Sequence, residues 1–291
     1  MTSPRWAVLA CLLVGALPAL AEALPAQRLH SRYAELQDRL RDNPFRRPVV
    51  LDSTETQREV SGDVYAVLAY PFAAVSLALN NPDHWCDVIS LHANTKYCRA
   101  SVTGAGTVLQ VHIGKKTPQE LNVVPRIDFQ YVLKAASPDY LDIELQASEG
   151  PLGTRDYRLA FEAVPLPQSR TFLHLTYSYA TSFTAKLAMQ AYLATVGHSK
   201  VGFTPLPMTT PGEAQMIGGV RGLVERNTMR YYLAIDSFLA TAGVAPKAQL
   251  EKRLQTWFTA VETYPNQLHE MERGEYLAMK RAEYARQQLA D

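Results

Sequence analysis

The sequence predicts an α+β fold, in which an antiparallel sheet is covered by one long helix near the C-terminus and further helices lie at both ends of the chain. Three observations support this prediction. Apolar and polar residues alternate between 49 and 179, apolar residues recur at helical spacing from 219 to 242, and the chain of 291 residues is long enough to bury a full core. A sheet with one apolar face must bury that face, and the long helix is the predicted cover.

Residues 1–21 are typical of a secretory signal peptide. Arg5 precedes an unbroken apolar run at 6–17, and a small-residue pattern follows that ends in Ala21. The run is about twelve residues long, well short of the roughly 20 that a membrane-spanning helix needs. We predict cleavage after Ala21 and a periplasmic or secreted protein. An uncleaved anchor, or a lipid anchor on Cys11, is the alternative.

The charge balance gives no indication of nucleic-acid binding. The chain carries 29 basic and 28 acidic residues, and loss of the signal peptide removes Arg5, leaving 28 basic beside 28 acidic residues. A neutral balance favours neither nucleic acid nor an anionic membrane surface as a partner. The sequence contains no internal repeat or low-complexity tract.

Residues 22–47 are expected to form an N-terminal helical arm. The stretch 27–43 is polar and helix-forming, and Pro44 and Pro48 end it. Its thin apolar stripe must rest on another part of the protein. The stripe consists of Leu29, Tyr33, Leu36 and Leu40.

The predicted main domain spans 48–242. It begins with a strand that runs into a short helix within 63–81, and the pattern changes at Pro71. Turn-rich segments separate the later strands and indicate hairpins, and CRASVTG and TVLQVHI are expected to form one more. Four segments alternate clearly between apolar and polar residues: 127–133, 141–146, 157–163 and 173–179.

The spacing of apolar residues becomes helical after the sheet. A short helix is expected at 183–196, and a long one at 219–242. Two polar, amphipathic helices at 246–263 and 267–289 make up a predicted C-terminal extension, residues 243–291.

The segment VYAVLAYPFAAVSLALNNPDHW and the element order after it resemble the START-like, polyketide-cyclase-like superfamily. In that segment a strand ends at Pro71, a helix follows, and Asp83 and Trp85 stand in the "D, any, W" relation. The resemblance covers residues 63–242 and implies a helix-grip fold, in which a curved antiparallel sheet wraps on the long helix. The signal peptide and terminal helices suggest an exported, bacterial-type branch.

The resemblance implies an apolar cavity that holds a lipid, a sterol or a polyketide-like molecule, and it implies no cofactor. Inward-facing tyrosines suit such a lining because the ring prefers burial while the hydroxyl needs a partner. Plain core packing is the alternative for each residue. The expected ligand-binding residues are Phe129, Tyr131, Phe161, Tyr177, Tyr179, Asn227 and Tyr231.

Asn227 is an anomaly in the middle of the long helix's apolar stripe. A buried amide without a partner costs about 1–3 kcal/mol, so a neighbouring backbone group or a polar ligand headgroup should bind it. The charged neighbours are expected on the flanks of the helix as ion pairs. They are Arg221, Glu225, Arg226 and Arg230, with Arg221 and Glu225 four residues apart.

The stretch DHWCDVISLHANTKYC combines His84, Cys86, His92 and Cys98. Their spacing matches no zinc pattern that we can defend, and the C-x-x-C of redox sites is absent. Two cysteines remain once the signal peptide is removed, and in an exported protein this indicates a disulfide between Cys86 and Cys98. A metal site and free thiols are the alternatives, and no metal ligand is predicted.

No enzyme motif is found in the sequence. GHSKVG, at 197–202, lacks the second glycine of a nucleophile elbow, and Arg273 stands where a zinc-protease helix needs its second histidine after His269 and Glu270. Strand alternation assigns His174 to the polar face of the sheet. No catalytic residue is therefore predicted.

The leading hypothesis is a periplasmic binding or carrier protein for a hydrophobic small molecule. One alternative is an enzyme of the same fold, of the cyclase or hydrolase type, that acts on an apolar substrate through Asn227, His174 or a cavity tyrosine. Another is an envelope interaction module with a filled core. In either case the terminal helices could bind a membrane or an envelope protein.

Overall fold

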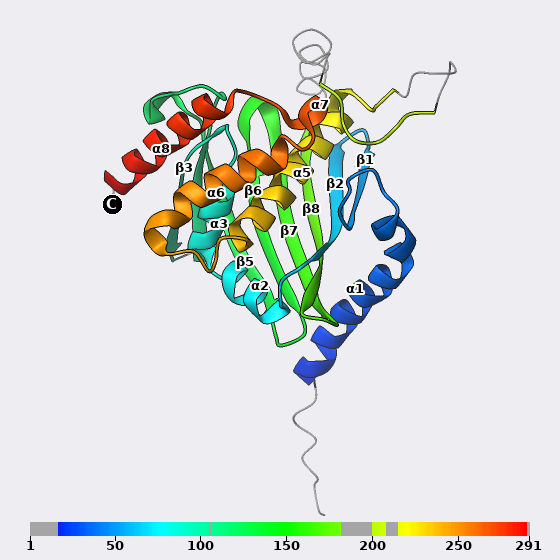
Figure 1. Ribbon diagram of the computed structural model, residues 1–291. Coiled ribbons are helices and arrows are strands. Elements are labelled where there is room, and N and C mark those ends of the chain that lie inside the picture. Colours follow the sequence, from blue (N-terminus) through cyan, green and yellow to red (C-terminus); the bar gives the residue numbers. More distant parts are fainter. Residues whose placement is uncertain (1–16, 105, 182–199, 208–214, 290–291) are drawn as a thin grey trace, which may run out of the picture.

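The structure is a computed structural model that describes residues 17–104, 106–181, 200–207 and 215–289 (Figure 1). Its elements follow the predicted order: an N-terminal helix, a first pair of strands, two short helices, further strands and then the long helix near the end. They are α1 (Leu17–Arg41), β1 (Val49–Glu55), β2 (Glu59–Leu68), α2 (Phe72–Leu79), α3 (Pro82–Ile89), β3 (Thr95–Thr103), β4 (Gly106–Ile113), β5 (Arg126–Ala136), β6 (Leu141–Glu149), β7 (Thr154–Leu166), β8 (Arg170–Thr181), α5 (Gly219–Leu239), α6 (Pro246–Val261), α7 (Pro265–Leu268) and α8 (Arg273–Leu289).

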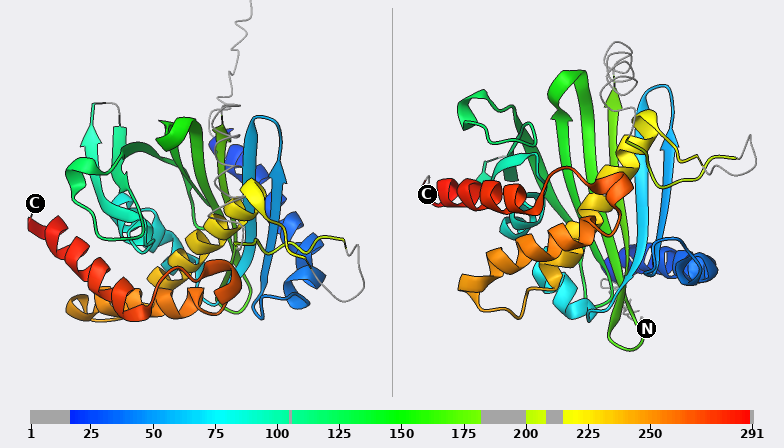
Figure 2. Two further views of the ribbon diagram at one scale, coloured as in Figure 1. Left: turned by 90° about the horizontal axis from the view of Figure 1, so that it is seen from above. Right: turned by 45° about the horizontal axis from the view of Figure 1, so that its top comes forward.

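The strands form one curved sheet of eight, in the order β1-β2-β8-β7-β6-β5-β4-β3, and all neighbours are antiparallel. Strands β3 to β8 form a meander, and β8 pairs with β2, so that Val64 lies opposite Leu175. Seen from above, the sheet curves around α5 (Figure 2). This is the predicted α+β class, and the wrapping of the sheet on a long helix is the helix-grip arrangement.

Helix α5 lies directly on the concave face, chiefly against β2. The close approach requires a glycine, because a Cβ on Gly62 would lie 2.3 Å from Thr228 Oγ1. Leu233 and Ile235 of α5 are fully buried in the main core, together with Val64 of β2 and Leu175 of β8. The predicted helix at 219–242 is confirmed and ends slightly earlier.

Helix α1 packs on the outer face of the sheet, on the opposite side from α5 (Figure 2). The predicted apolar stripe is the contact surface: Leu29, Leu36 and Leu40 are buried there, and the Tyr33 ring lies 5.0 Å from that of Phe172. The alternation of apolar and polar residues along the strands predicted that this face is polar and exposed to water. Part of it is apolar instead, because Val50, Tyr140, Val164, Leu166 and Phe172 point outward and need the arm as cover.

The C-terminal helices form a further layer over α5 and against β3 (Figure 1). The predicted helix at 267–289 is divided into α7 and α8, and Glu270 in the break turns back to Arg230 of α5. A buried ion pair fastens α8 to the sheet, since Glu283 lies 2.9 Å from Lys96 of β3. Lys280 of the same helix also pairs with Glu283 and donates to Thr95 O at 2.7 Å. The helix predicted at 183–196 lies outside the described residues, as does most of the predicted signal peptide. Among the described helices, none has the length and apolar character to cross a membrane.

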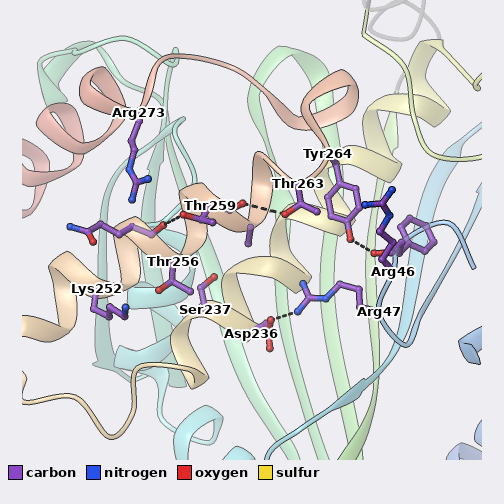
Figure 3. Close-up of a pocket in the computed structure, with 13 residues that line it drawn as sticks. Arg46, Arg47, Asp236, Ser237, Lys252, Thr256, Thr259, Thr263, Tyr264 and Arg273 are labelled. Carbon is purple, nitrogen blue, oxygen red and sulfur yellow. Dashed lines mark hydrogen bonds and ion pairs between the residues drawn. The ribbon is translucent and has the colours of Figure 1, made fainter.

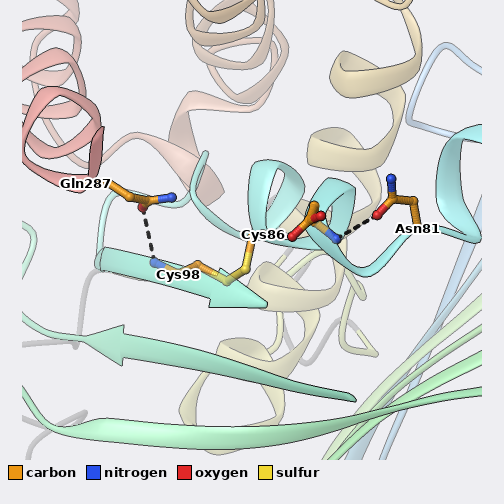
Figure 4. The surroundings of a disulfide bond; sticks show 5 residues. Asn81, Cys86, Cys98 and Gln287 are labelled. Carbon is orange, nitrogen blue, oxygen red and sulfur yellow. Dashed lines mark hydrogen bonds between the residues drawn. A yellow bond between two sulfur atoms is a disulfide. The ribbon is translucent and has the colours of Figure 1, made fainter. Parts of the chain in front are cut away.

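The predicted disulfide joins Cys86 of α3 to Cys98 of β3, with 5.2 Å between their Cα atoms (Figure 4). Asn81 caps α3 by accepting a hydrogen bond from the Asp83 backbone at 2.9 Å. The indole of Trp85 donates to Leu79 O at 2.7 Å, so this side chain ties α3 to α2. The cysteines are therefore part of the architecture.

Candidate functional site

Aromatic side chains gather on the concave face of the sheet beside α5. Tyr157 and Tyr179 stack with their ring centroids 5.3 Å apart, Tyr177 lies 5.2 Å from Tyr231, and Phe129 lies 6.3 Å from Tyr157. Strands β5, β7 and β8 and helix α5 thus contribute to one group. We call it the aromatic cluster, and its members are Phe129, Tyr131, Tyr157, Tyr177, Tyr179 and Tyr231.

Five of the seven residues predicted to bind a ligand belong to this cluster, and Asn227 borders it. Phe161 lies apart, because its ring packs edge-on against Trp85 at 6.0 Å in the solid part of the core. The sequence placed Tyr157 on the inward face of its strand without singling it out. That it bridges Phe129 to Tyr179 depends on the curvature of the sheet.

Several members of the cluster keep contact with solvent. Tyr131, Tyr157 and Tyr231 are partly exposed, whereas Tyr177 and Tyr179 are buried. Burial raises the pKa of Tyr131 to about 12, and it also raises the pKa values of Tyr177 and Tyr231. The phenols are therefore neutral at physiological pH, and they offer hydroxyl groups on an otherwise apolar surface.

Polar atoms without a protein partner lie in and around the cluster. Within the described residues, Tyr131 Oη, His92 Nε2 and Trp257 Nε1 are buried and make no hydrogen bond. Each such atom costs about 1–3 kcal/mol unless water or a ligand binds it.

His92 connects the cluster to the C-terminal helices. Its ring lies 4.3 Å from that of Tyr231 and 6.0 Å from that of Trp257. Burial, and then the charge of Arg230, lower the pKa of His92 to about 3, so the imidazole is neutral. Its position in the sequence suggested no role other than that of a metal ligand. In the part of the chain that the structure describes, no three His, Cys, Asp or Glu side chains converge as a metal site.

Asn227 finds its partners among side chains. Its Oδ1 accepts a hydrogen bond from Arg230 Nη1 at 3.3 Å, and its side chain is hydrogen-bonded to the Tyr177 hydroxyl. The backbone partner is not found among the described residues, and contact of Asn227 with a ligand stays a prediction. The amide joins α5 to β8 at the edge of the aromatic cluster.

The charged residues of α5 do not line exposed flanks as predicted. Arg226 and Arg230 are only 4% and 6% exposed, and Glu225 is fully buried. Arg221 and Glu225 meet at the Ser53 hydroxyl, to which Arg221 Nε donates at 2.7 Å and which donates to Glu225 at 2.5 Å. Local spacing could not reveal this burial, because the covering segments come from distant parts of the sequence.

His174 lies on the outer face of the sheet, as alternation predicted, but it is not freely solvated. Its Nε2 lies 2.8 Å from Asp63 and its Nδ1 lies 3.2 Å from Glu162, and Tyr65 stacks on the ring at 4.3 Å. Because the sheet separates it from the aromatic cluster, His174 cannot act on a molecule held there.

A separate hollow of about 530 Å³ lies between α5, α6 and the segment that follows α1 (Figure 3). Its lining is mostly polar. Arg47 pairs with Asp236 at 2.6 Å, and the Tyr264 hydroxyl donates to Phe45 O at 2.9 Å. These contacts tie the segment to the helices, and the lining offers little apolar surface to a hydrophobic molecule.

No protein-family model and no curated protein matches this sequence. Solved structures with a similar fold include the Zhui aromatase/cyclase from Streptomyces (13% identity, 69% of this chain and 94% of that chain, TM-score 0.34). Norcoclaurine synthase from Thalictrum flavum (13%, 52% and 87%, 0.33) and human StAR-related lipid transfer protein 5 (11%, 55% and 84%, 0.30) are further examples. At these identities and scores, nothing about ligand or activity follows from the likeness.

Proposed function

We propose that this protein binds or carries a hydrophobic small molecule against the aromatic cluster. The observation that carries the proposal is the combination of inward-facing aromatic rings with buried polar atoms that have no partner in the described chain, Tyr131 Oη and His92 Nε2. Large apolar surfaces with a few oriented polar groups are typical of small-molecule sites. Lipid-like or polyketide-like molecules suit such a surface.

We propose further that the protein works in the periplasm or outside the cell, after its signal peptide has been cleaved off following Ala21. The Cys86–Cys98 disulfide supports this location, since disulfides persist in oxidising compartments. The intact mass and N-terminal sequence of the exported protein test the proposal. A mature chain that begins at Glu22 is expected, and a chain that retains residues 1–21 would contradict it.

A neutral fluorescent probe, N-phenyl-1-naphthylamine, tests the binding surface. We expect saturable binding that weakens about tenfold in Tyr157→Ala, because the bridge between Phe129 and Tyr179 is lost. Tyr33→Ala is the matched control, since that ring packs on the outer face of the sheet. Absence of saturable binding, or equal loss in both variants, would contradict the proposal.

A further inference from the structure

A group of basic side chains borders the aromatic cluster where α5, the loop after β4 and the segment around α7 meet. Three of them share a single carboxylate, that of Glu270. Lys116 lies 2.6 Å from it, Lys200 lies 4.0 Å from it, and Arg230 also pairs with it. The fourth is Arg226. Positive charge therefore exceeds negative charge at this place.

Arg226 is the least compensated member of the group. It is 4% exposed, and within the described residues it makes one hydrogen bond, from Nη1 to Val201 O at 3.2 Å, and no ion pair. A buried guanidinium has five N–H donors and strongly favours a charged or polar partner. Burial, and then the charge of Arg230, lower the pKa of Arg226 to about 10, so it remains charged at neutral pH.

The neighbouring carboxylates do not remove this excess. Glu225 is occupied elsewhere, since it accepts hydrogen bonds from Ser53, from the backbone N–H groups of Phe203 and Thr204, and from the Thr204 hydroxyl. Glu55 acts electrostatically on Tyr179 but is exposed at the end of β1. Four basic groups therefore lie beside one partly buried carboxylate, that of Glu270.

The basic group and the aromatic cluster are continuous. Arg230 is linked to the Tyr177 hydroxyl through Asn227, and Arg226 lies within electrostatic range of Tyr179. A molecule that lies on the aromatic rings would therefore place one end next to the guanidinium groups. The site therefore has neutral phenols along the aromatic cluster and positive charge at the basic side chains beside it.

We propose that the ligand is an amphiphile with an anionic headgroup, a carboxylate or a phosphate, which Arg226, Arg230 and Lys116 bind while its apolar part lies on the aromatic cluster. The inference rests on the proposed function, because it names the class of molecule for the same site. Arginine binds carboxylates and phosphates with two parallel hydrogen bonds, and Arg226 has donors to spare.

Three probes with one dodecyl chain test the headgroup: dodecanoate, dodecyl phosphate and dodecanol. Calorimetric titration of the full mature chain should show that at least one anionic probe binds about tenfold or more tightly than dodecanol. Arg226→Gln should abolish that preference. The preferred anionic probe distinguishes a carboxylate from a phosphate ligand.

Lys116→Gln provides a second variant in case Arg226→Gln fails to fold, which circular dichroism reports. Arg281→Gln is the matched control, because that guanidinium, in α8, is half exposed and pairs with Glu251 of α6.

Equal binding of all three probes would overturn the anionic headgroup while leaving the proposed function intact. Failure of every probe to bind would count against the proposed function itself. Tight binding of inorganic phosphate without any gain from the dodecyl chain would also overturn the inference.

Discussion

The side chain of Asn227, in the middle of α5, is hydrogen-bonded to the hydroxyl of Tyr177 on β8. The same amide accepts a hydrogen bond from Arg230 at 3.3 Å. One polar side chain therefore links the helix to the sheet and the basic group to the aromatic cluster. The Asn227 amide therefore contributes both to the contact between α5 and β8 and to the position of Arg230.

Replacement of Asn227 by Leu should lower the free energy of unfolding by about 1–3 kcal/mol, because the Tyr177 hydroxyl loses its partner in a buried setting. Urea denaturation of the purified protein measures the change. Tyr177→Phe combined with Asn227→Leu should recover part of the loss, since both polar partners are then removed. A more stable Asn227→Leu variant would show that the amide does not stabilise the fold.

Removal of the Cys86–Cys98 disulfide should lower the free energy of unfolding by roughly 3 kcal/mol in the chain-entropy model, because the closed loop has a sequence separation of 12. The double variant Cys86→Ser, Cys98→Ser and the reduced wild-type protein should show the same loss. Mass spectrometry after alkylation provides the control. Two alkylated thiols in the exported protein without reductant would contradict the disulfide.

His174 should make stability fall as pH rises above about 6.5. Burial opposes its protonation, but hydrogen bonds to Asp63 and Glu162, and then their charges, outweigh burial and raise the pKa of His174. Its stabilising contribution is therefore fully present below the unfolded pKa of about 6.5, and it is lost as pH rises through the folded pKa. Asp63 and Glu162 have the opposite pH dependence, because their pKa values are lowered in the folded protein. Their contribution to stability is therefore lost only as pH falls into the acid range.

Urea denaturation from acid to mildly alkaline pH tests this linkage. The stability difference between wild-type protein and His174→Gln should be largest near about pH 5.5, one unit below the unfolded pKa of about 6.5, and should shrink as pH rises. His112→Gln is the control, since that imidazole contacts a backbone carbonyl at 3.3 Å and, among the described residues, no carboxylate. A difference that does not vary with pH would contradict the ion-paired state of His174.

The α1 arm should depend on its buried leucines. Leu36 is 2% exposed against the outer face of the sheet, whereas Leu24 of the same helix is 65% exposed. Leu36→Ala should weaken docking of the arm by about 2–5 kcal/mol, the usual range for a buried leucine, and Leu24→Ala should leave it unchanged. Limited proteolysis near Arg46 measures release of the arm. Equal protection of both variants would show that the arm does not need this contact.

The strands and the long helix could be predicted from the sequence, because each has a local signature. Tyr177 and Tyr179 alternate with polar neighbours along β8, and the apolar residues of α5 repeat every three or four positions. The disulfide followed from the count of cysteines in an exported chain, and the apolar stripe of the arm indicated that it must dock somewhere.

The charged part of the site could not be predicted in the same way. Arg226 and Arg230 read as surface residues, because the segments that bury them, around Val201 and Glu270, are far away in the sequence. The position of His92 beside Tyr231 depends on how α3 and α5 cross. Contacts of this kind follow from the curvature of the sheet and not from any period in the sequence.

Native mass spectrometry of the mature protein, purified from the envelope of its own source, tests the central proposal most directly. We expect a co-purifying amphiphilic anion that is retained by the wild-type protein and by Tyr33→Ala, and is lost from Tyr157→Ala. Repeated recovery of ligand-free wild-type protein that also fails to take up dodecanoate, dodecyl phosphate or dodecanol would contradict it.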